Sequence, residues 1–149
     1  GTHLGAFTVH HRDQGGPDAW GVAGTIPNPG ADWGGFGSDA ALDGDTLLIG
    51  AYYADGQLPD SGLVYVFRRD HGGPDRWGLV ATISAADGRT DDRFGNWVSL
   101  SGDTALISAT EHDYVGWNSG AAYIFTISDA FYADGFEIGD TSEWSVTVP

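Results

Sequence analysis

The sequence predicts an all-β protein, and two observations support this prediction. Gly accounts for 24 of the 149 residues in a chain that is 13% aromatic, which indicates short strands joined by many tight turns. The chain also repeats itself, because residues 5–26 match residues 62–83 and residues 36–67 match residues 94–125. A period of 57 to 58 residues predicts a repeat architecture in which neighbouring units bury each other's faces.

The expected strands follow this repeat in order. The chain opens with two strands, at 5–12 and 20–26, joined by a loop with the turn sequence Gly-Gly-Pro-Asp. The next unit carries four strands, each rich in Val, Ile, Leu, Tyr or Thr: 37–42, 46–51, 62–69 and 77–84. Its third strand is apolar at every position from Leu63 to Phe67, which is typical of a strand covered on both faces.

Two further features of the strands belong to both copies of the repeat. Gly44 and Gly102 lie in the short connections between the first two strands of their units, where Gly supplies the positive φ of a hairpin turn. Trp20 and Trp77 share one repeat position at the start of a strand, so we expect both side chains to pack between units.

Four strands per unit predict the blades of a β-propeller. The fold class is therefore all-β, a partial β-propeller of about two and a half repeats. Residues 1–127 hold a half blade at 5–26, a full blade at 36–84 and three strands at 94–127, and residues 128–149 form a C-terminal tail. Since a propeller needs about four to eight blades, we expect a longer chain, extending upstream of Gly1, to complete the ring.

The charge of the chain disfavours several kinds of partner. Six Lys and Arg stand against 21 Asp and Glu, giving a formal net charge of −15. Such a surface repels phosphate backbones and anionic headgroups, so we expect no nucleic-acid partner. No apolar run approaches the roughly 18 residues of a bilayer span, so we expect no membrane insertion.

Three segments carry a resemblance to a known family, and their order and spacing recur in both copies. They resemble the FG-GAP repeats of integrin-α-like β-propellers, in the variant common in bacterial secreted and surface proteins. The segments are DRFG (92–95), LSGDTALI (100–107) and SGAAYIF (119–125). The resemblance covers residues 5–127 and implies an extracellular or cell-surface location. The chain departs from the family at Tyr52 and Thr110, where Pro is usual after Gly-Ala.

The same resemblance implies calcium as a cofactor, because family members often carry a calcium loop after the second strand. The residues with oxygen-bearing side chains in register are Asp55 and Asp60 in one copy, and Asp113 and Asn118 in the other. Calcium takes six to eight oxygen ligands, so two side chains per loop supply only part of a site. The alternative is that these residues form local turn hydrogen bonds.

Aromatic residues in the same loops are the candidate binding residues: Tyr52, Tyr53, Tyr114 and Trp117. Trp33 and Trp97 also break the repeat and are candidates for exposed contacts. The leading hypothesis is a non-catalytic binding or adhesion module that recognises a protein or glycan, and a purely architectural repeat is a further hypothesis. The alternative is a propeller-type hydrolase or lyase acting on extracellular polysaccharide through acidic residues such as Glu111, with no catalytic residue assigned.

The sequence pattern of the last residues differs from that of the repeats. Residues 134–145 look like a short tail found at the C-termini of some secreted bacterial proteins, with Ile138 where Ser is usual. The segment is then a sorting or attachment tail. The alternative is an irregular end that packs Phe136 and Trp144 on the last blade.

Overall fold

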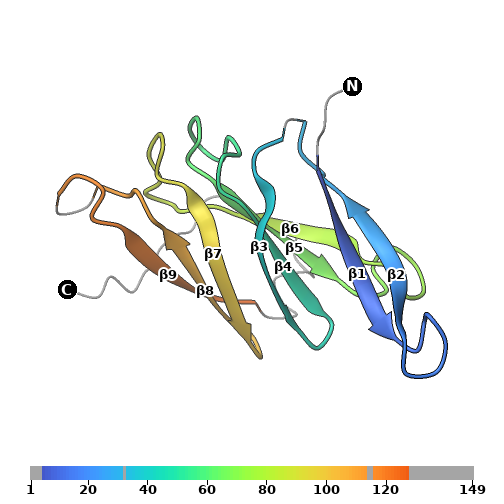
Figure 1. The fold of residues 1–149 in the computed structure, drawn as a ribbon. Helices are drawn as coiled ribbons and strands as arrows, with labels where there is room; N and C mark the ends of the chain where they lie inside the picture. Colours follow the sequence, from blue (N-terminus) through green and yellow to red (C-terminus); the bar gives the residue numbers. More distant parts are fainter. Residues whose placement is uncertain (1–4, 32, 114–115, 128–149) are drawn as a thin grey trace.

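The computed structural model describes residues 5–31, 33–113 and 116–127, and these residues form nine strands (Figure 1). The strands make three antiparallel sheets that lie side by side. The first sheet is β1 (Ala6–Arg12) and β2 (Trp20–Pro27); the second is β3 (Phe36–Asp43), β4 (Thr46–Ala51), β5 (Leu63–Arg68) and β6 (Gly78–Ile83); the third is β7 (Phe94–Ser101), β8 (Thr104–Ala109) and β9 (Ala121–Thr126). The all-β fold with a four-stranded blade is confirmed. The proposed tail, 128–149, lies outside the described residues.

The hairpins of the two copies are built alike. Asp43 pairs with Thr46 and Ser101 pairs with Thr104, so each connection has two residues and begins at a Gly with positive φ. The expected turn at Gly44 and Gly102 is therefore present. It sets the register in which alternate side chains of β4 face the first and third sheets.

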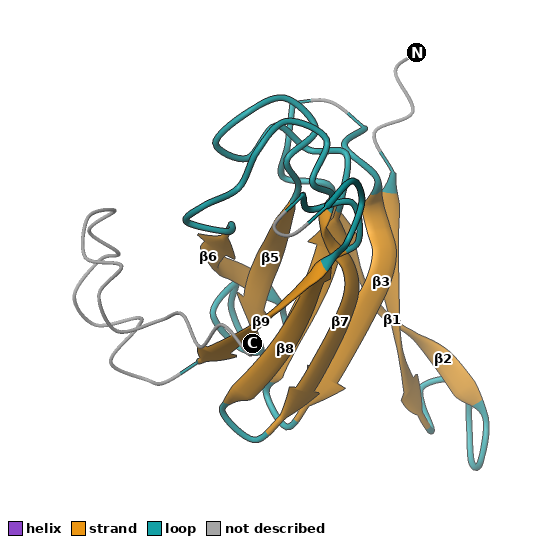
Figure 2. Ribbon diagram, turned by 90° about the vertical axis from the view of Figure 1, so that its left-hand side faces the viewer, coloured by secondary structure: helices purple, strands orange, loops and turns teal. Residues whose placement is uncertain are grey.

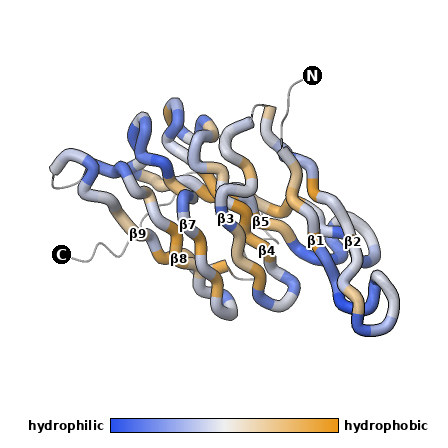
Figure 3. The backbone as a smooth tube through the Cα atoms, in the orientation of Figure 1, coloured by the Kyte–Doolittle hydropathy of each residue, from blue (hydrophilic) through white to orange (hydrophobic). Residues whose placement is uncertain are grey.

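Two apolar clusters hold the three sheets together. The first lies between the first and second sheets and includes Ile49, Tyr65 and Phe67. The second lies between the second and third sheets and includes Leu48, Val64, Val66, Phe94, Val98 and Ile107. Strands β4 and β5 are buried on both faces as expected for blades, and Figure 3 shows their hydrophobic residues against hydrophilic loops.

The joint between the second and third sheets has polar contacts as well as apolar ones. Asp39 in β3 accepts a hydrogen bond from the backbone N–H of Val98 in β7 at 2.8 Å. Asp43 accepts one from the N–H of Gly102 at 2.7 Å. These two carboxylates stabilise the joint by pairing backbone groups of β7 and its hairpin that the third sheet leaves free.

The joint also depends on a close approach of two backbones at Gly50. A Cβ atom added to Gly50 in β4 would lie 2.1 Å from the carbonyl oxygen of Gly95 in β7. Carbon and oxygen do not approach so closely without a bond, so only Gly fits at this point. The two sheets can pack at this separation because position 50 has no side chain.

The third sheet does not repeat this joint on its outer face. Leu106 and Ile124 are 47% and 45% exposed, whereas Leu48 and Val66 at the same repeat positions are both 0% exposed. The residues that replace Asp39, Asp43 and Gly50 are Trp97, Ser101 and Ser108. The outer face of the third sheet therefore lacks the carboxylates and the Gly that join the second sheet to the third.

Candidate functional site: an aromatic shelf at the loop end

The candidate site lies where the long loops gather at one end of the sheets (Figure 2). Backbone hydrogen bonds fix these loops against each other. Tyr53 donates to the carbonyl of Gly34 at 3.0 Å, which ties the β4–β5 loop to the β2–β3 loop. Phe94 donates to the carbonyl of Ser61 at 2.9 Å, which ties the start of β7 to the β4–β5 loop. Side chains far apart in the sequence therefore share one surface.

Three aromatic rings pack together on this surface. The ring centroids of Tyr52 and Tyr53 are 4.2 Å apart, and those of Trp33 and Tyr53 are 5.8 Å apart. These separations are within the range of favourable aromatic contact. Trp33 is 54% exposed, while both Tyr side chains are half-buried. The three rings thus form a supported apolar surface that remains open to solvent.

Arg93 completes this surface from the β6–β7 loop. Its guanidinium carbon lies 4.8 Å from the ring centroid of Tyr53, a cation–π contact. Its Nη1 atom lies 2.8 Å from a carboxylate oxygen of Glu111. We call Trp33, Tyr52, Tyr53 and Arg93 the aromatic shelf. Glu111, from the β8–β9 loop, holds the cation in place over the ring.

The backbone of Arg93 is strained in a way that its repeat partner is not. Arg93 has φ of 58°, in the left-handed region, and the equivalent residue of the first copy is Gly35, with φ of 71°. A left-handed conformation costs a residue with a side chain roughly 1–2 kcal/mol, whereas Gly adopts it freely. Strain of this kind gathers at functional sites. In the second copy, the strained backbone conformation of Arg93 is kept, and its guanidinium group lies on the shelf.

The hydroxyl group of Tyr52 keeps its proton at ordinary pH. Burial raises the pKa of Tyr52 above its usual 10.0, and the charge of Tyr53 and a hydrogen bond with it raise the pKa further, against a lowering by Arg93. The shelf therefore offers aromatic faces, phenolic hydroxyl groups and one cation. These groups suit flat, mostly apolar molecular surfaces that carry hydroxyl groups.

The predicted binding residues are only partly brought together. Tyr52 and Tyr53 belong to the shelf. Trp117 is 89% exposed on the β8–β9 loop and so is not packed into it, and Tyr114 lies outside the described residues. Sequence reasoning missed Arg93 as a binding residue. The available signal was that Arg93 replaces a Gly at the same repeat position.

The predicted calcium residues form turns. Asp55 accepts a hydrogen bond from the N–H of Asp60 at 3.0 Å, and Asp113 accepts one from the N–H of Asn118. The same pairing, with a positive φ at the second residue, occurs in two other loops: Asp13 with Asp18 and Asp70 with Asp75. Asp55 and Asp113 each use one carboxylate oxygen in this turn, as the alternative reading expects. Calcium at these loops stays a prediction.

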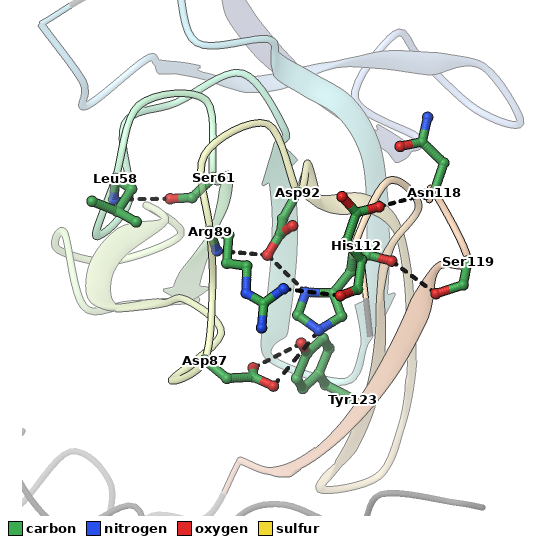
Figure 4. A network of polar contacts seen from close by, with 10 residues as sticks. Leu58, Ser61, Asp87, Arg89, Asp92, His112, Asn118, Ser119 and Tyr123 are labelled. Atoms are coloured by element: carbon green, nitrogen blue, oxygen red, sulfur yellow. Dashed lines mark hydrogen bonds and ion pairs between the residues drawn. The ribbon is translucent and has the colours of Figure 1, made fainter. Parts of the chain in front are cut away.

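A buried polar network supports the loop that carries Arg93 (Figure 4). His112 is 1% exposed, and its Nδ1 atom lies 2.7 Å from a carboxylate oxygen of Asp92. The same oxygen accepts a hydrogen bond from the N–H of Arg89 at 2.6 Å. His112 Nε2 lies 3.7 Å from Asp87, whose other oxygen accepts a hydrogen bond from Tyr123 at 2.8 Å. The network fixes Asp92 against the third sheet and so positions the residue that follows it.

Within the described residues no helix is long and apolar enough to cross a membrane.

Comparison with known proteins agrees with the fold. A search of curated proteins gives no match. The family model described as FG-GAP repeat matches residues 25–67 and 77–125, which together cover more than half of the chain. The sheets, the hairpins repeated at Gly44 and Gly102, and this match lead to one conclusion: the chain belongs to the FG-GAP repeat family.

Proposed function

We propose that this chain is a non-catalytic binding module of a secreted or cell-surface protein, and that the aromatic shelf contacts its ligand. The observation that carries the proposal is Arg93. It keeps a left-handed backbone where the first copy uses Gly, and it lies over Tyr53 while paired with Glu111. Arg93 has a strained backbone and places a cation on an exposed aromatic surface, and this combination supports a role in recognition.

The size and chemistry of the shelf favour a glycan over a protein surface. The shelf presents four side chains, whereas a stable protein interface buries about 800 Å² on each partner, from about 20–30 residues. A sugar ring is similar in size to an aromatic ring. It presents an apolar face for stacking, and its hydroxyl groups can form hydrogen bonds. Because the chain carries a net charge of −15, a neutral glycan fits better than an anionic one.

The proposal is tested with a glycan array and a set of matched variants. We expect the full chain to bind a neutral glycan, and Trp33→Ala or Tyr53→Ala to weaken that binding by at least about tenfold, the loss of roughly one aromatic contact. Trp20→Ala is the control, because Trp20 is 69% exposed at the far end of β2. Equal binding by the shelf variants and the wild-type chain contradicts the proposal.

Two other outcomes separate the remaining hypotheses. A hit only on a protein array, abolished by the same variants, keeps the shelf as the binding surface but replaces the glycan by a protein ligand. Hydrolase or lyase action on extracellular polysaccharide stays a prediction. It is measured as the release of reducing ends or unsaturated products by the full chain.

A further inference from the structure

The third sheet has a free edge at β9. In the second sheet, β5 pairs with β4 on one side and with β6 on the other. Its counterpart β9 pairs with β8, and no fourth strand lies beside it among the described residues. An edge of this kind leaves backbone N–H and C=O groups ready to pair with another strand.

The side chains of β9 are also less covered than those of β5. Phe67 is 2% exposed and belongs to a cluster against which Trp77 packs. Phe125, at the same repeat position, is only half-buried. Trp77, which directly precedes β6, thus helps to cover Phe67, and no residue of a fourth strand covers Phe125 among the described residues.

The fourth strand of each unit has a recognisable sequence. Trp20 begins β2, which reads WGVAGTIP over residues 20–27, and Trp77 directly precedes β6. Residues 144–149 read WSVTVP. Like β2, this segment begins with Trp and has Val two positions later. Like β2, it ends with Thr, an aliphatic residue and Pro. The two sequences are therefore similar, with two residues fewer at the C-terminus.

The composition of the C-terminal residues fits the same assignment. Residues 144–148 carry no charge, and three of the five are β-branched, as in strands. Residues 128–143 hold five Asp and Glu and no Lys or Arg, as in a solvated connection. A connection of 16 residues reaches either end of β9, because extended chain spans about 3.3 Å per residue.

We propose that residues 144–148 form the fourth strand of the third blade, paired with the free edge of β9. The occupant of this edge is then a segment of the same chain, and Trp144 takes the place that Trp77 has in the second blade.

Amide hydrogen exchange on the full chain tests the proposal. We expect residues 121–126 to be protected in the wild-type chain and to exchange at least about tenfold faster in Trp144→Ala. Trp117→Ala is the matched control, since Trp117 is 89% exposed, and it should leave exchange in β9 unchanged. Protection of β4, which is buried on both sides, reports in every variant that the rest of the protein is folded.

A pair of Pro substitutions gives a second, independent test. Alternate N–H groups of an edge strand face the neighbouring strand, so one of Val146→Pro and Thr147→Pro removes a bond to β9 and the other does not. We expect one of the two to speed exchange in β9 and Ala133→Pro to leave it unchanged. Exchange in β9 that is the same in every variant overturns the proposal. Protection that depends on protein concentration also overturns it, because a second copy then pairs with the edge.

Discussion

Substitution of Gly50 by Ala is the sharpest test of how the second and third sheets are joined. The added Cβ would lie 2.1 Å from the carbonyl oxygen of Gly95 and 3.0 Å from the hydroxyl of Ser38. An ordinary contact between carbon and oxygen is more than 3 Å, so the sheets must separate locally by about 1 Å. The φ of Gly50 is not in the left-handed region, so Ala meets no backbone strain of its own.

The magnitude follows from the packing around this point. Leu48 and Val64, both 0% exposed, lie in the apolar cluster that the two sheets share. Forcing one extra carbon into a closely packed joint costs about 1–3 kcal/mol. For a chain of this size each kcal/mol lowers Tm by about 2–4 °C, so we expect a loss of about 2–12 °C.

Thermal melting followed by circular dichroism measures this loss. Gly24→Ala is the control, because Gly24 lies in β2 with no atom within 4 Å of its added Cβ and no positive φ. It should be neutral or slightly stabilising, by about 0.4–1 kcal/mol, through the unfolded state. If Gly50→Ala melts at the wild-type temperature, the close approach of the two backbones does not limit the joint.

Three further predictions concern stability and metal binding. Asp39→Ala leaves the N–H of Val98 without its acceptor at 2.8 Å. The free energy of unfolding, measured by urea denaturation, should therefore fall by about 1–3 kcal/mol. An unchanged urea midpoint contradicts the role of this carboxylate. Burial, followed by the hydrogen bond to Asp87, raises the pKa of Tyr123 above 10.0, so the folded chain holds this proton more tightly than the unfolded chain. Unfolding free energy should therefore fall as pH rises above 10.0, and less steeply in Tyr123→Phe; parallel profiles refute this. Calcium bound at the loops of Asp55 and Asp113 should raise Tm at millimolar calcium, and no rise refutes the calcium prediction.

The strands were predictable from the sequence because both copies of the repeat carry the same apolar pattern. The run from Leu63 to Phe67 is apolar at every position and lies between two sheets. Trp20 and Trp77 show where such reasoning fails. They share a repeat position, yet Trp77 packs near Arg69 while Trp20 is 69% exposed. The expected packing of Trp20 is wrong for the described residues, because none of their three sheets lies against its side chain.

The site was less predictable than the fold. Tyr52 and Tyr53 were candidates because they lie in a loop that differs between copies. The contact of Tyr53 with Arg93 joins loops 40 residues apart and depends on the packing of the sheets, which composition does not reveal. The roles of Asp55 and Asp113 remained open, because an Asp that accepts a turn hydrogen bond and one that binds calcium look alike in sequence.

The glycan affinity of Arg93→Gly, measured together with its Tm, tests the proposed role of the shelf most directly. Gly relieves roughly 1–2 kcal/mol of backbone strain. This offsets the lost ion pair with partly exposed Glu111, about 0.2–1 kcal/mol, and the lost cation–π contact with Tyr53, about 0.5–1 kcal/mol. We therefore expect an unchanged or higher Tm and an affinity lowered by about tenfold or more, since the cation is lost from the shelf. Wild-type affinity in this variant contradicts a role for Arg93 in binding, and a clear fall in Tm assigns it to the fold instead.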